Sequence, residues 1–404
     1  MNEETISQNE QVATANRVNE ILSYYGIKTG KITFVKGPSV TRYRVSLLDS
    51  RQVRKIQTLE SDLVMSLTAC GVRIIPPKIS NGKYVYIEIP NEKPELVTMR
   101  TILDSQRFQD ENDMQLPVAL GYTISNEVFM FDLAKAPHLL VGGACGTGKS
   151  VTVNAIIASL LHKKKPSELK FVLVDPKMVE FSPYKPLWNS YLDAFSDTER
   201  ENLIITDCDD LIVKLNALVA EMENRYTLLM DAGVSNIKDY NAMITSYQLD
   251  TDKQVTPTLR HYYLPYIIVI IDEYGDFIMR AGKQVETPIV RITQKAHTVG
   301  VHMILATQRP SVNIVTGVIK ANIPTRIALR TQRMIDSRTI LDAKGAEQLI
   351  GRGDMLYSDA HYNITRVQGA YIGETEINNL VNHIASQDYS GKQYTLPFCE
   401  VKDI

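Results

Sequence analysis

The residues whose types and spacing most clearly indicate a chemical role form a glycine-rich loop. Its spacing matches the phosphate-binding pattern G-x-x-x-x-G-K-[ST]. The loop reads Gly143-Ala144-Cys145-Gly146-Thr147-Gly148-Lys149-Ser150 and is followed by Val151. In such a loop, backbone N–H groups surround phosphate oxygens, the lysine contacts the terminal phosphates and the hydroxyl is a ligand of Mg²⁺. We therefore expect residues 143–151 to bind ATP, with Lys149 on the phosphates and Ser150 on Mg²⁺.

Two acids follow a second apolar segment. Asp272 and Glu273 come directly after the run 266–271, whose β-branched residues are typical of a central parallel strand buried on both faces. Asp272 can hold the magnesium ion, and Glu273 can orient and deprotonate the water that attacks the γ-phosphate. An acid pair after a strand is also a common helix N-cap. Because the phosphate loop is present in the same chain, we favour the catalytic interpretation.

A third strand signal, at 301–307, ends in Gln308. A polar residue at that position faces the same strand ends as the nucleotide. Gln308 is therefore a candidate sensor of the γ-phosphate, and the alternative is an ordinary surface glutamine.

The elements that must position these residues alternate between strands and helices. Strands are predicted near 128–131, 139–141, 170–174, 266–271, 301–306 and 325–329, with further strands near 354–357 and 365–371. Helices between parallel strands predict an α/β domain with a doubly wound, mostly parallel sheet. A smaller α+β domain precedes it. We predict a disordered tail at 1–12, the α+β domain at 13–110, the α/β domain at 111–385 and an irregular tail at 386–404.

Composition limits the location and the partners. No apolar stretch approaches the roughly 18 residues that cross a bilayer, the polar start has no signal-peptide character, and the four cysteines have no metal or disulfide spacing. The cytoplasm is the expected location. The net charge of -2 argues against a generic nucleic-acid binder, although residues 301–350 carry seven Lys/Arg against three Asp/Glu. That basic excess fits a pore or a contact with a neighbour's nucleotide, and also fits a solvated face.

Several longer strings resemble the FtsK/SpoIIIE family of DNA translocases. They are LKFVLVDPKMVEF at 169–181, ATQRPSV at 306–312, GVIKANIPTRIA at 317–328, DSRTILD at 336–342 and GRGDMLY at 351–357. The strings EMENRY at 221–226 and GPSVTRY at 37–43 extend the resemblance over most of the chain, from about residue 13 to about residue 385.

The resemblance implies a hexameric ring of identical subunits with double-stranded DNA threaded through it. The first domain would correspond to the family's α domain and the second to its RecA-like β domain, with ATP between subunits. In such rings an arginine of one subunit stabilises charge on the neighbour's γ-phosphate. Arg326 and Arg338 are our candidates, with Arg291 behind them. A family helix that usually carries an arginine has His297 here.

Two features of the family are not expected in these residues, namely membrane helices before the motor and a winged-helix domain after it. Cys145 stands where relatives mostly have threonine, and a loop that works through backbone N–H groups should tolerate it. The favoured hypothesis is an ATP-driven double-stranded DNA translocase that serves chromosome segregation, cell division or DNA transfer. The alternatives are a protein-translocating secretion ATPase of the same fold and a non-catalytic structural ring component.

Overall fold

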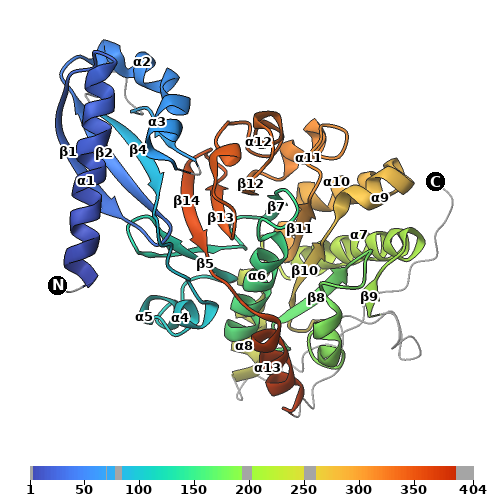
Figure 1. Ribbon diagram of the computed structural model, residues 1–404. Helices are drawn as coiled ribbons and strands as arrows, with labels where there is room; N and C mark the ends of the chain where they lie inside the picture. The colour runs from blue at the N-terminus through green and yellow to red at the C-terminus, as the bar shows by residue number, and fades with distance from the viewer. Residues whose placement is uncertain (1–2, 70, 78–83, 193–202, 250–260, 388–404) are drawn as a thin grey trace.

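The computed structural model describes residues 3–69, 71–77, 84–192, 203–249 and 261–387, and in these it shows two sheets in two adjoining domains (Figure 1). The predicted irregular tail at 386–404 lies almost wholly outside the described residues. The α/β fold class that the sequence predicts is confirmed by the larger sheet.

The first domain is built on an antiparallel sheet with the strand order β1-β2-β4-β3. Its elements are α1 (Glu3–Tyr24), β1 (Thr29–Lys36), β2 (Val40–Leu47), α2 (Val53–Thr58), α3 (Glu60–Leu67), β3 (Arg73–Ile75) and β4 (Tyr84–Pro90). Helix α1 contributes Val18 and Leu22 to a separate core that also contains Tyr43 of β2 and Ile87 of β4. This small core holds the first domain together independently of the second.

Helix α1 corrects the prediction of a disordered tail at 1–12, because the helix begins at Glu3. Residues 3–11 contain neither glycine nor proline, so nothing in their backbone opposes a helix. Gln11 is buried and accepts a hydrogen bond from the Tyr43 hydroxyl. This tertiary contact favours a helix that starts earlier than the apolar pattern indicates.

The second domain is built on a ten-stranded sheet with the order β6-β5-β14-β13-β12-β7-β11-β10-β8-β9. Its strands are β5 (Pro117–Thr123), β6 (Val128–Asp132), β7 (His138–Gly142), β8 (Leu169–Val174), β9 (Ile204–Ile205), β10 (Tyr266–Ile271), β11 (Val301–Thr307), β12 (Thr325–Leu329), β13 (Asp354–Ser358) and β14 (Ile364–Gly369). Its helices are α4 (Met99–Leu103), α5 (Gln106–Gln109), α6 (Lys149–Lys163), α7 (Cys208–Asp231), α8 (Ile237–Leu249), α9 (Tyr274–Ala281), α10 (Lys283–Lys295), α11 (Gly317–Asn322), α12 (Met334–Leu341) and α13 (Glu374–Ala385). Short 3-10 turns lie at Ser50–Gln52, Ser182–Leu187, Ala296–Val299 and Ala346–Gln348.

The centre of this sheet is parallel and fully buried. Strands β12, β7, β11, β10, β8 and β9 run in one direction, and every residue of β7, β8, β10 and β11 is buried. The crossover from β7 to β8 runs along the sheet opposite to the crossovers from β9 to β10 and from β10 to β11. Right-handed connections then place α6 on one face and α7 to α10 on the other. The carboxyl ends of β7, β10 and β11 therefore meet at one edge, as the sequence predicts.

Beyond β12 the sheet continues with antiparallel strands, of which the sequence analysis missed β5. Strand β5 pairs with β6 on one side and with β14 on the other. The run contains Gly121, whose φ of +152° and approach to the Gln368 carbonyl leave no room for a side chain. A strand that starts with proline and bends at glycine lacks the pattern that predicts a strand.

The boundary between the domains lies earlier than the predicted residue 110. Val97, Met99, Ile102 and Phe108 belong to the large apolar core of the second domain, and α4 contacts β5 and α6. Helices α4 and α5 therefore belong to the second domain. No helix in the described part of the chain is long and apolar enough to span a membrane.

Two buried histidines face each other across β7 and β11. His302 donates from Nδ1 to the Pro137 carbonyl 2.8 Å away, and Nδ1 of His138 accepts the Met303 N–H. The Nε2 atom of each ring is buried without a hydrogen-bond partner. Burial lowers the pKa of His302 to about 4 and the pKa of His138 well below its usual value.

We expect these histidines to make the protein acid-sensitive. They are neutral when folded but bind protons when unfolded, so stability is full above the unfolded pKa of about 6.5 and is lost as the pH falls toward 4. Between about pH 7.5 and pH 5, His302 should remove about 2 kcal/mol of unfolding free energy. Denaturant unfolding at both pH values measures this. His302→Asn keeps a donor for Pro137 but cannot titrate, and an unchanged pH dependence in that variant would contradict the assignment.

Candidate active site

The glycine-rich loop joins β7 to α6 and is held by the strands on either side. The N–H of Gly143 donates to the Thr307 carbonyl at 3.3 Å, and the N–H of Ala144 donates to the Arg330 carbonyl at 2.9 Å. Gly146 and Gly148 adopt φ values of +74° and +110°, which L side chains rarely adopt. A Cβ on Gly148 would lie 2.8 Å from the Gly353 nitrogen, whereas the space around Gly146 is open. The loop is thus a backbone cradle that fits a phosphate.

Lys149 and Asp272 form a buried ion pair at the centre of the site. The lysine Nζ lies 2.7 Å from Asp272 Oδ1 and also donates to the Asp272 backbone carbonyl. Both side chains are almost fully buried. The backbone of Asp272 is fixed in turn, because its N–H donates to the Val174 carbonyl. The pair brings the phosphate-contacting lysine and the predicted magnesium ligand to the same edge of the sheet.

The Glu273 side chain does not cap the helix that it precedes. Glu273 occupies the N-cap position of α9, but its side chain makes no capping hydrogen bond. Instead, Oε1 accepts from the Thr307 hydroxyl at 2.6 Å and Oε2 accepts from the Gln308 backbone N–H at 2.8 Å. The arrangement therefore disfavours the capping alternative and leaves the carboxylate beside the loop.

Thr307 is a site residue that the sequence analysis missed. Its hydroxyl donates to Glu273 and accepts from the Arg309 N–H at 3.0 Å, so both hydrogen-bonding roles are used. The side chain of the neighbouring Gln308 is partly exposed at the same strand end. A hydroxyl residue directly before the candidate sensor is the only sequence signal for this contact, and it is a weak one.

A cavity of about 450 Å³ adjoins the loop. It is lined by Ala144, Cys145, Gly146 and Thr147 together with Arg330, Thr331, Gln332, Glu347, Ile350, Gly351 and Arg352. Its volume falls within the usual range of small-molecule sites. The exposed cations Arg330 and Arg352 give its polar rim a positive character that suits an anionic ligand.

The candidate arginines lie apart from this constellation and differ in their surroundings. Arg326 sits on β12 level with Leu140, three residues before the loop begins. Its buried guanidinium donates to Asp342 and to the carbonyls of Lys320, Ile323 and Ile340. Arg338 of α12 is exposed, and Arg291 makes a surface ion pair with Glu223 at 3.1 Å. Arg338 is therefore more accessible than Arg326. His297 is exposed, and its ring centroid lies 6.2 Å from that of the buried His138.

Two family models match the chain. The model of the FtsK/SpoIIIE family matches residues 98–312, and the model of the FtsK alpha domain matches residues 1–91. The interval between the two matches agrees with the domain boundary that the apolar cores indicate.

Relatives named DNA translocase FtsK match almost the whole chain. The protein of Chlorobaculum tepidum is 41% identical over 398 residues, which cover 98% of this chain and 47% of that protein. The protein of Haemophilus influenzae is 40% identical over 396 residues, which cover 94% of this chain and 72% of that protein. The chain thus spans less than half the length of the first of these relatives.

Two solved structures share the fold. The conjugation coupling protein TcpA of pCW3, solved as a monomer with ATPγS, has a TM-score of 0.59 and 20% identity, and the match covers 92% of this chain and 99% of TcpA. The cytoplasmic domain of the Thermomonospora curvata type VII secretion ATPase EccC has a TM-score of 0.57 and 21% identity, covering 76% of this chain and 36% of EccC. The second domain therefore has the fold of P-loop ATPases.

Proposed function

Since this chain belongs to the FtsK/SpoIIIE family, we propose that it hydrolyses ATP to move double-stranded DNA. The observation that carries the proposal is the position of Glu273 beside the phosphate loop, held by Thr307 and Gln308 rather than by a helix terminus. A carboxylate fixed there can act on a water molecule at the γ-phosphate. The name DNA translocase, which the relatives carry, supports DNA as the substrate.

Each residue of the site then has a chemical role. The backbone N–H groups of the loop that donate to no backbone carbonyl in this structure, at Cys145, Gly146 and Gly148, and the Lys149 ammonium hold and neutralise the phosphates. Ser150 and Asp272 would hold Mg²⁺, which neutralises charge on the phosphates when it is bound. Glu273 orients a water and accepts its proton, and Gln308 contacts the γ-phosphate. To reach the phosphates, the Lys149 ammonium has to exchange part of its contact with Asp272 for the ligand.

The proposed active assembly is a homohexameric ring in the cytoplasm, working in chromosome segregation, cell division or DNA transfer. Arg338 would reach the γ-phosphate held by the neighbouring subunit, because it is exposed while Arg326 is engaged within its own chain. A cation supplied by the neighbour makes hydrolysis depend on ring assembly.

ATP turnover with and without linear duplex DNA tests this function. We expect DNA to stimulate turnover several-fold, with scrambled sequences equally effective. The DNA concentration for half-maximal stimulation should rise by a factor on the order of ten or more between about 50 and 200 mM salt, because phosphate contacts release counterions. Lys149→Ala is the control for a contaminating ATPase. Turnover that ignores DNA, or stimulation that follows sequence and ignores salt, would contradict the proposal.

A further inference from the structure

One short segment lies between the first domain and the phosphate loop. We call residues 345–353 the wall segment, because Glu347, Ile350, Gly351 and Arg352 line the cavity beside the loop. At its end, the Gly353 N–H donates to the Thr147 carbonyl at 2.9 Å, so the segment is bonded to the loop itself. Its position therefore helps to determine the shape of the cavity.

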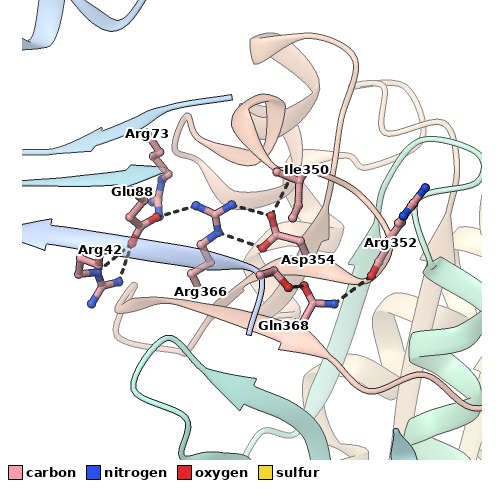
Figure 2. A network of polar contacts seen from close by, with 9 residues as sticks. Arg42, Arg73, Glu88, Ile350, Arg352, Asp354, Arg366 and Gln368 are labelled. Atoms are coloured by element: carbon pink, nitrogen blue, oxygen red, sulfur yellow. Dashed lines mark hydrogen bonds and ion pairs between the residues drawn. The ribbon is translucent and has the colours of Figure 1, made fainter. Parts of the chain in front are cut away.

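Arg366 of β14 connects this segment to the first domain (Figure 2). Its Nε and Nη2 atoms donate to the two carboxylate oxygens of Asp354 at 2.9 and 2.7 Å, and its Nη1 donates to Glu88 Oε2 at 2.8 Å. Asp354 also accepts the N–H of Ile350 at 2.9 Å. A continuous chain of charge-assisted hydrogen bonds thus leads from β4 of the first domain to a residue that lines the cavity.

Gln368 makes a second connection of the same kind. It lies two residues after Arg366 on β14, so both side chains are on the same face of the strand. Its amide Nε2 donates to the Arg352 carbonyl at 2.9 Å, and its Oε1 accepts from the hydroxyl of Ser39 in the first domain. Figure 2 shows the two connections side by side, each ending at the backbone of the wall segment.

The first-domain end of the main connection is anchored by charge. Glu88 is fully buried and contacts Arg42 and Arg73 as well as Arg366. Burial by itself would raise the pKa of Glu88, but the three guanidinium groups outweigh it and lower the pKa to about 2. The carboxylate therefore stays ionised at any working pH. Because separating buried charges is costly, this ion pair fixes the position of the two domains relative to each other at this point.

We propose that Arg366 is a positioning residue through which the first domain sets the affinity of the ATPase domain for its nucleotide, with Gln368 as a second, parallel connection. The proposal rests on the proposed function, since it assumes that the cavity and the loop hold ATP or ADP. Glu88 and Ser39 touch neither the loop nor the cavity in this structure. The hydrogen-bonded route from each of these two residues to the wall segment runs through a side chain of β14.

The test is ADP binding by calorimetry on the full chain carrying Glu88→Gln, which removes the charge but keeps the shape. We expect ADP affinity to fall about fivefold or more, and KM for ATP to rise by a similar factor with kcat almost unchanged. Glu221→Gln is the matched control, because Glu221 is another buried acid paired with an arginine, at 2.7 Å from Arg225 in α7. It should lower the unfolding temperature similarly and leave ADP affinity unaltered.

Ser39→Ala serves as the second variant, since losing one hydroxyl is tolerated even if loss of the Glu88 charge prevents folding. We expect a smaller fall in ADP affinity, about twofold, and a larger one when both substitutions are combined. Two results would overturn the positioning role without contradicting the nucleotide site. One is wild-type ADP affinity in folded Glu88→Gln and Ser39→Ala, and the other is an equal loss of ADP affinity in Glu221→Gln. If the wild-type chain itself fails to bind ADP, the result contradicts the proposed function and not only the positioning role.

Discussion

Replacing Lys149 by alanine should reduce ATP turnover to below about one hundredth of the wild-type rate, because the ammonium that neutralises the phosphates is lost. The same change should also weaken nucleotide binding. Glu273→Gln should behave differently. It should lower kcat by a factor on the order of 10² to 10⁴, the usual contribution of a general base, while ATP affinity stays within about twofold. A glutamine side chain can keep one of the two contacts that Thr307 and Gln308 make with Glu273.

Turnover and ATP binding measured on both variants separate the two roles. Glu127→Gln is a suitable control, since Glu127 is an exposed acid in the turn before β6 and should retain wild-type behaviour. Thermal unfolding should accompany the assays, because Lys149→Ala leaves the buried Asp272 without its ion-pair partner. If Glu273→Gln loses nucleotide affinity as severely as Lys149→Ala, Glu273 is a binding residue and not the base.

Arg338→Ala should abolish turnover in a ring made only of that variant, by a factor on the order of 10³, and leave ATP binding intact. Activity should return on mixing with Lys149→Ala subunits. In an equal random mixture, half the loops and half the arginines are sound, so up to about a quarter of the interfaces pair a good loop with a good arginine. Turnover over a range of mixing ratios, in rings shown to exchange subunits, measures this recovery.

Arg326→Ala is the informative comparison. Its guanidinium holds three backbone carbonyls and Asp342 of its own chain, so its loss should appear as a lower unfolding temperature. Mixing that variant with Lys149→Ala should not restore the missing stability. Recovery with Arg326→Ala and none with Arg338→Ala would reverse our preference, and recovery with neither would direct attention to Arg291.

The candidate catalytic edge of the sheet was predictable because its evidence is local. Asp272 and Gln308 each follow directly after an apolar run that only a buried strand explains, and Lys149 follows another such run after the glycine-rich loop. Parallel strands bring such ends together. What Glu273 contacts was not predictable. Its partner, Thr307, lies 34 positions away, and only the pairing of β10 with β11 brings the two together.

The link between the domains is further out of reach of a sequence pattern. Glu88 and Arg366 are 278 positions apart, and a charged residue in a strand normally indicates a solvated face. Here the charges are buried because each one compensates another. Arg326 is a second example. Its charge suggested a contact with a neighbouring subunit, but in the structure its guanidinium donates hydrogen bonds to carbonyl groups of its own chain.

The antiparallel extension of the large sheet has a consequence for how the chain is made. Strand β5 emerges from the ribosome before the phosphate loop does, but its partner β14 follows roughly 240 residues later. At synthesis rates of about 5–20 residues per second, the β5–β6 hairpin waits roughly 10 to 50 s with an unpaired edge. During that time its backbone can pair with another nascent chain. The first domain can fold in this interval, because its core needs only residues before Pro90. The Arg366 partner of its buried Glu88, however, is absent until β14 has been synthesised.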